Sequence, residues 1–228
     1  PTVNSGAETR TVKITVTTGD GKENVDSKDI TVSQPGIDKD ALILGVHVKE
    51  GAIAPAKLPV KGVSEVTVDW GDGKDAETLT TDFPTHEYAD TGYFVVSVKG
   101  QATGLSTSSL SYEQKDQIEN VYNWGKLGLT SMDNAFDGCT YLANVPTDDT
   151  GAFSKVTSFK YAFQRCEKFT EIPEGLLANA GELITVESMF QYCYNIKSIP
   201  AKIFANCPKL QSVKAAFYLC REVKSVDK

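Results

Sequence analysis

The stretch "AFQRCEKFTEIP", from Ala162 to Pro173, decides the fold because it recurs along the chain at a fixed spacing. The other copies are "AFDGCTYLANVP", "MFQYCYNIKSIP" and "AFYLCREVKSVD", which begin at positions 135, 189 and 216. In every copy a phenylalanine stands three positions before a cysteine, and the interval between successive copies is constant. The resulting 27-residue period is typical of stacked repeats, in which neighbouring turns bury each other's apolar faces.

The repeated positions predict a ladder of side chains through the core. Its members are Phe136, Phe163, Phe190, Phe217, Cys139, Cys166, Cys193 and Cys220. A weaker apolar series lies between the copies, so that half-repeats alternate and their first apolar residues fall at positions 129, 142, 156, 169, 183, 196, 210 and 223. We expect short strands at the apolar pairs, a single helical turn around each phenylalanine, and prolines that end the strands.

The cysteines could react, bind metal, form disulfides or fill space in the core. The repeats contain no histidine, since the only two are His47 and His86, and this disfavours a metal site. Five cysteines without a C-x-x-C pair do not fit a dense disulfide framework, although a disulfide between neighbouring turns stays an alternative. We therefore expect small, packed thiols rather than reactive ones.

The repeated unit resembles the BspA-like leucine-rich repeats of bacterial surface proteins, over about residues 129–228. The resemblance implies a solenoid of short strands and short helical turns. The 27-residue period is longer than the commonest form of that family.

A different pattern precedes the repeats. "EVTVDW" and "YFVVSV" alternate apolar and polar residues, which is typical of half-buried strands. Trp70, followed by "GDG", and then His86, Tyr88, Gly92 and Phe94 resemble the signature of PKD domains, with Phe94 in place of the usual tyrosine. The resemblance implies an all-β, immunoglobulin-like sandwich that acts as a spacer or interaction module outside the cell.

The predicted fold is therefore mixed, a β-sandwich followed by a leucine-rich solenoid. Two further runs, "TVKITVTT" and "DSKDITVS", predict a β-hairpin with its turn at "GDGKEN". The hairpin packs on a neighbour or is the remnant of an upstream PKD-like module, and "QPGID" links it to the next module. Tyr122 and Trp124 are predicted to cap the first repeated turn. The expected segments are the hairpin at 1–36, the PKD-like sandwich at 37–104, a linker and cap at 105–128, and about four repeated turns at 129–228.

Charge and composition limit the function. The net charge of −7 and pI near 5.0 argue against nucleic-acid binding, and no apolar run is long enough to cross a bilayer. Residues 193–228 form a basic end, with seven Lys or Arg against two Asp or Glu. We see no nucleophile-base pair, so we expect neither catalysis nor a cofactor.

Exposed basic and aromatic residues are the binding candidates. They are Lys197, Lys224, Lys214, Tyr141, Tyr192, Tyr194 and Tyr218. The turn after Trp70 contains weak calcium candidates, Asp69, Asp72 and Asp75. The alternative is that these are solvated acidic residues of a tight turn.

The two resemblances together imply an exported adhesion protein, a surface or outer-membrane lipoprotein of the Bacteroidetes type whose signal and anchor lie outside this sequence. Its partner would be a protein of a host or neighbouring cell. The alternative is a glycan-binding accessory protein of a carbohydrate-uptake system, with edge tyrosines stacking on sugar rings.

Overall fold

The computed structural model describes residues 10–18, 26–34, 38–52 and 54–226. In this part of the chain the protein is mostly β-structure, with eleven strands and one short helix. The chain divides into two compact units, residues 1–38 and 39–228.

An antiparallel pair of strands makes up the described part of the first unit. β1 (Arg10–Thr18) pairs with β2 (Asp26–Gln34) along the full length of both strands. The alternating residues of the two runs predict these strands. The turn predicted at "GDGKEN" and the centre of the linker predicted at "QPGID" lie outside the described residues.

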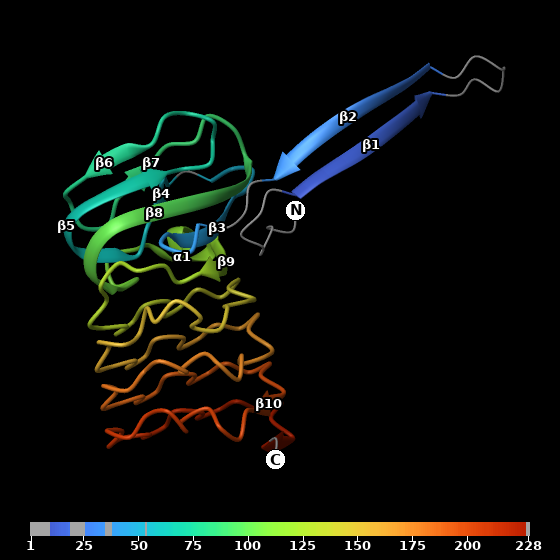
Figure 1. Cartoon of the computed structure of the whole chain (residues 1–228). Helices are drawn as coiled ribbons and strands as arrows, with labels where there is room; N and C mark the ends of the chain where they lie inside the picture. Colours follow the sequence, from blue (N-terminus) through green and yellow to red (C-terminus); the bar gives the residue numbers. More distant parts are fainter. Residues whose placement is uncertain (1–9, 19–25, 35–37, 53, 227–228) are drawn as a thin grey trace. The chain divides into compact units, whose positions relative to one another are not determined.

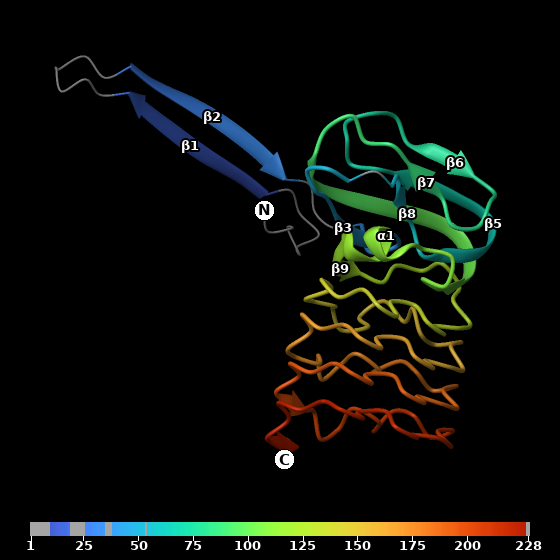
Figure 2. The same cartoon turned by 180° about the vertical axis from the view of Figure 1, so that it is seen from behind.

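A five-stranded antiparallel sheet dominates the upper part of the second unit (Figures 1 and 2). Its strand order is β6, β5, β8, β3, β9, and β4 pairs separately with β7. The bounds are Leu42–Val48 for β3, Ala56–Lys57 for β4, Val60–Asp69 for β5, Glu77–Leu79 for β6, Thr85–His86 for β7, Gly92–Leu105 for β8 and Ile118–Asn123 for β9. Val66, Val68 and Trp70 are buried while Thr67 and Asp69 are exposed, so one face of β5 covers the core.

The segment predicted to be linker and cap, residues 105–128, contributes to the same sheet as β8. β8 continues to Leu105, and β9, which lies in the segment predicted to be linker and cap, joins the same sheet beside β3. The short helix α1 (Tyr112–Asp116) connects the two strands, and a capping box between Ser111 and Gln114 begins it. Residues 118–123 of this segment are therefore part of the sheet, because β9 pairs with β3.

Trp124, which the sequence predicts to be part of a cap, packs against residues of the first repeated turn. It is 1% exposed, its ring centroid lies 4.9 Å from that of Phe153, and its Nε1 donates to the carbonyl of Pro146 at 2.9 Å. Tyr122 does not share this role, although the sequence predicts that it does. It belongs to β9, and its hydroxyl lies 3.3 Å from that of Tyr93 on β8.

The rest of the chain forms turns that stack against the sheet (Figures 1 and 2). Parallel bridges join equivalent residues of successive turns, one full period apart, in the order Gly104, Ser131, Ser158, Thr185 and Ser212. A second column runs from the bridge between Asn120 and Asn144 to the pairing of β10 (Ser198–Ile199) with β11 (Ser225–Val226). Both columns continue strands of the sheet, since Gly104 lies on β8 and Asn120 on β9.

The segment around each phenylalanine is not the single helical turn that the sequence predicts. The Phe163 N–H donates to the carbonyl of Met189 on the next turn at 2.8 Å, whereas the Cys166 N–H donates back to Phe163 at 3.3 Å. Tyr161 and Arg165 have left-handed backbone, with φ of 57° and 59°, and equivalent residues of the other turns do too. A right-handed helix cannot continue through such residues, and their N–H groups are directed to the neighbouring turn instead.

The repeated phenylalanines and cysteines lie in columns inside the stack. Those with no exposed surface are Phe136, Phe163, Phe190, Cys139, Cys166 and Cys193, whereas Phe217 and Cys220 are partly buried. The rings of Phe163 and Phe190 stack with centroids 5.4 Å apart, and the Cys193 thiol donates to the Phe163 carbonyl at 2.9 Å. All five cysteines are free, so no disulfide joins neighbouring turns.

The aromatic residues that follow β5 gather into one cluster. The rings of Trp70 and His86 stack with centroids 4.8 Å apart, and the Tyr88 hydroxyl donates to the Trp70 carbonyl at 2.8 Å. His86 Nε2 lies 3.0 Å from Asp72 Oδ2. These contacts tie the turn after β5 to β7 and to the residues that follow β7, which is a structural role.

Two glycines of this turn provide a matched pair of variants. Gly71 and Gly73 have φ of 74° and 82°, so alanine at either position costs about 1–2 kcal/mol of backbone strain. At Gly71 a Cβ would also lie 2.4 Å from the Val95 carbonyl oxygen, whereas at Gly73 it would meet nothing within 4 Å. We expect Gly71→Ala to lower the free energy of unfolding in urea by at least about 1 kcal/mol more than Gly73→Ala. Equal losses would contradict this close approach.

Candidate binding surface

Three of the predicted tyrosines meet on the cysteine-bearing side of the last two turns. The ring centroid of Tyr192 lies 6.2 Å from that of Tyr194 and 6.1 Å from that of Tyr218, edge to face in both pairs. The stacked backbone fixes this arrangement, because the Tyr192 N–H donates to the Tyr218 carbonyl at 2.9 Å. We define the three tyrosines, together with Arg165 and Arg221, as the tyrosine cluster.

The two arginines of the cluster hold its rings. The guanidinium carbon of Arg165 lies 5.5 Å from the ring centroid of Tyr192, and that of Arg221 lies 5.0 Å from Tyr194. Such contacts contribute about 0.5–1 kcal/mol at exposed sites. Arg165 is also 3.5 Å from the carboxylate of Asp137, whose pKa is raised by burial against the opposing effect of nearby cations. These contacts restrict the rings of Tyr192 and Tyr194 before any partner binds.

The structure places the three predicted lysines of the basic end in two different columns of residues. Lys197 and Lys224 are exposed on neighbouring turns, and the Lys224 N–H donates to the Lys197 carbonyl at 3.2 Å. Lys214 lies in a different column, where its Nζ is 3.8 Å from Glu187, and Glu187 also pairs with Lys160 at 3.3 Å. Lys160, Glu187 and Lys214 thus alternate in charge along that column, and Lys214 forms an ion pair within the protein.

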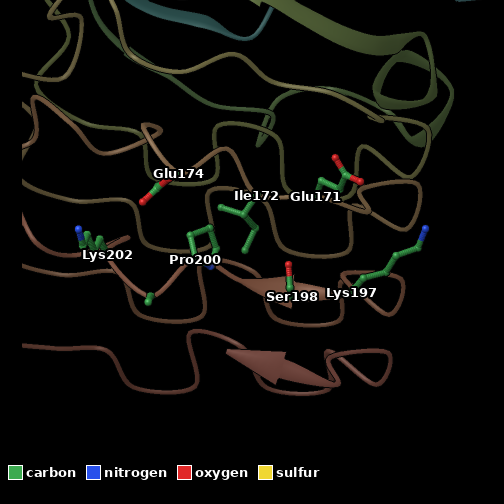
Figure 3. Close-up of a pocket in the computed structure, with 8 residues that line it drawn as sticks. Glu171, Ile172, Glu174, Lys197, Ser198, Pro200 and Lys202 are labelled. Carbon is green, nitrogen blue, oxygen red and sulfur yellow. The ribbon is translucent and has the colours of Figure 1, made fainter. Parts of the chain in front are cut away.

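A hollow of about 390 Å³ opens beside Lys197 between neighbouring turns. It is lined by Glu171, Ile172, Glu174, Lys197, Ser198, Pro200, Ala201 and Lys202. Figure 3 shows one glutamate and one lysine on each side, with the isoleucine and the proline between them. Hydrogen-bond donors and acceptors thus surround a small apolar floor. This chemistry suits a polar ligand with an apolar face.

Two of the three calcium candidates are engaged by protein groups. Asp69 Oδ1 accepts the backbone N–H two residues on at 2.9 Å, and the Asp72 carboxylate lies 2.8 Å from Lys74 Nζ and 3.0 Å from His86 Nε2. The hydrogen bond from Lys74 lowers the pKa of the Asp72 carboxyl. Asp75 is exposed, and the described residues contain no group of three or more His, Cys, Asp or Glu that could hold a metal ion.

The fourth predicted tyrosine, Tyr141, lies apart from the tyrosine cluster. It is 41% exposed, and the Nζ of Lys49 lies 3.3 Å from its ring centroid. The sequence pattern did not predict Lys49, Arg165 and Arg221 as partners of the tyrosines. The contact of Arg165 could have been predicted from the repeat. Arg165 stands one full period before Tyr192, at the equivalent position of the preceding turn.

In the part of the chain that the structure describes, no helix combines the length and apolar character needed to cross a membrane. Comparisons with protein-family models, with curated proteins and with solved structures give no match to this chain.

Proposed function

We propose that the protein is a non-catalytic binding protein of the cell surface, exported and anchored as a lipoprotein. In this proposal a PKD-like sandwich carries a BspA-like solenoid to a protein partner. The tyrosine cluster is the observation that carries the proposal. Tyrosine and arginine are enriched at the energetic centres of protein interfaces, and rings that are already ordered lose little entropy on binding.

The repeat geometry supports the fold part of this proposal. Bridges that recur once per period and the columns of buried rings are what a solenoid requires. The contacts among Trp70, His86 and Tyr88 bring together the residues on which the PKD resemblance rests. Family and function are inferred from these features jointly.

Binding to immobilised extracellular-matrix proteins, measured by surface plasmon resonance, tests the proposal. We expect Tyr218→Ala and Arg221→Ala each to weaken a detected protein partner about tenfold or more. Tyr112→Ala is the matched control, because Tyr112 is 85% exposed and lies outside the cluster. A partner whose affinity is unchanged by Tyr218→Ala and Arg221→Ala would refute the cluster as its site.

The lysines on neighbouring turns make a second arm of this experiment. If the basic end assists the partner, Lys197→Ala/Lys224→Ala will abolish a salt-sensitive signal, since exposed charges act through screened attraction. A salt-sensitive signal that survives this double substitution would exclude both lysines.

Glycan binding, as in a carbohydrate-uptake system, is the second candidate function, and the hollow in Figure 3 favours it. A glycan array would then give hits that Lys197→Ala and Lys202→Ala weaken while Tyr112→Ala does not. Glycan hits without any protein partner would replace the first proposal.

A further inference from the structure

A second hollow lies where the loop after β3 meets α1 and the first repeated turn. We call it the junction hollow, and its volume is about 460 Å³. It is lined by Lys49, Glu50, Gly51, Ala52, Glu113, Asp116, Gln117 and Tyr141. Its three carboxylates outnumber its single ammonium group. The lining therefore attracts cations rather than anions.

Hydrogen bonds hold two of these carboxylates in place. Glu113 Oε1 accepts the Ala54 N–H at 3.2 Å, and Asp116 Oδ1 accepts the Thr140 hydroxyl at 2.6 Å. An ionised carboxylate offers about four acceptor sites, so Asp116 keeps capacity for a further donor. The fixed orientation reduces the entropy lost when a donor binds.

Gln117 adds a buried acceptor to the same lining. Gln117 is only 4% exposed, and its Nε2 donates to the Ala54 carbonyl at 3.2 Å. Its Oε1 has no hydrogen-bond partner among the described residues. Buried polar atoms are rarely left unpaired, because the loss of hydration is not compensated. Gln117 thus leaves one acceptor of the lining residues without a donor.

Tyr141 supplies the aromatic wall and already accepts a cation. The Nζ of Lys49 lies 3.3 Å from the ring centroid and 3.9 Å from Glu119 Oε1. A guanidinium matches this site better than an ammonium, because it is planar, stacks on aromatic rings and carries five donors in a fixed fork. A guanidinium guest that stacks on this face of the ring has to displace Lys49.

We propose that the junction hollow binds an arginine side chain presented by a partner polypeptide, which displaces Lys49 from Tyr141. This site is separate from the tyrosine cluster and does not depend on the function proposed for it. The ring and the acceptors come from three segments of the folded unit, so the site exists only in the assembled protein.

Titration of the intact protein with a blocked Gly-Arg-Gly peptide, followed by NMR, tests the proposal. The control peptide carries citrulline, which has nearly the shape of arginine but no charge. We expect saturable binding of the arginine peptide, at least about tenfold weaker binding of the citrulline peptide, and intermediate binding of a lysine peptide. Equal binding of the arginine and citrulline peptides, or no saturation at millimolar arginine peptide, would overturn the proposal. If free arginine binds more tightly than the peptide, the statement that a partner polypeptide presents the arginine is wrong.

Variants locate the site. Lys49→Met removes the internal cation, so the arginine peptide should bind about two- to fivefold more tightly. Asp116→Asn, which keeps an acceptor for Thr140, and Tyr141→Leu should both weaken it, while Tyr112→Ala should not. A gain of affinity cannot arise from unfolding, so the Lys49 variant is decisive even if another variant folds poorly. Unchanged or weaker binding by Lys49→Met would contradict the proposed site.

Discussion

Replacement of Phe190 by alanine will lower the free energy of unfolding by about 3–5 kcal/mol. Phe190 has no exposed surface, and its ring stacks between those of Phe163 and Phe217 at centroid distances of 5.4 and 5.6 Å. It also lies 5.9 Å from the ring of Phe169. Removal of the ring leaves a cavity that faces two neighbouring turns, which cannot both move into it. Equilibrium unfolding in urea measures the loss.

Two controls accompany this experiment. Tyr218→Ala removes an aromatic side chain of similar size from the surface, since Tyr218 is 54% exposed, and should cost much less. Phe190→Leu keeps most of the apolar volume and should cost less than the alanine variant. A loss below about 0.5 kcal/mol for Phe190→Ala would place this side chain outside the core.

The ladder thiols will react slowly with a disulfide reagent in the native protein, and Cys220 will react before the others. The thiolate is the reactive form, and burial raises the pKa of the Cys220 thiol from 9.0 to about 11. At pH 8 this lowers its thiolate fraction about 100-fold. Burial raises the pKa values of Cys139, Cys166 and Cys193 as well, and these side chains have no exposed surface. They should react only when the stack opens.

Labelling at several pH values, with mass spectrometry to assign each thiol, separates these cases. Because the folded pKa of Cys220 is raised, its rate should keep rising about tenfold per pH unit up to about pH 10. In urea-unfolded protein the rise should level off near pH 9, the ordinary thiol value. Native labelling of Cys193 as fast as in the unfolded chain would contradict its place in the core.

The sequence allows prediction of the buried columns because the repeat imposes the same environment on equivalent residues. Phe163 and Phe190 occupy equivalent positions, so one pattern identifies both, and the strict 27-residue spacing also indicates which residues lie next to each other in successive turns. Strands with alternating residues, such as β5, are predictable for a similar reason. Their pattern is local and depends only on which face is buried.

The geometry of the turns could not be predicted in this way. Tyr161 and Arg165 adopt left-handed backbone, although neither residue type favours it. Contacts with the next turn impose this conformation, since it directs N–H groups to carbonyls of that turn, as from Phe163 to Met189. This constraint cannot be predicted from the residue types of one turn, because it comes from contacts with the next turn.

Contacts between segments that are distant in the sequence could not be predicted either. β9 joins the sheet through β3, and "IENVYN" by itself did not distinguish a sheet strand from a cap. The junction hollow combines Lys49 with Gln117 and Tyr141, residues that become neighbours only after the sheet and the first turn have assembled. Sites of this kind require the tertiary structure.

Deletion of one full period tests the central claim, that 27-residue turns stack in register on the sheet. Removal of residues 159–185 joins Ser158 to Val186 and restores the register, whereas removal of residues 159–172 joins Ser158 to Pro173 and breaks it. Circular dichroism during urea unfolding should show one cooperative transition for the first variant and none for the second. Loss of folding in both variants, or equal stability of both, would contradict stacking with this period.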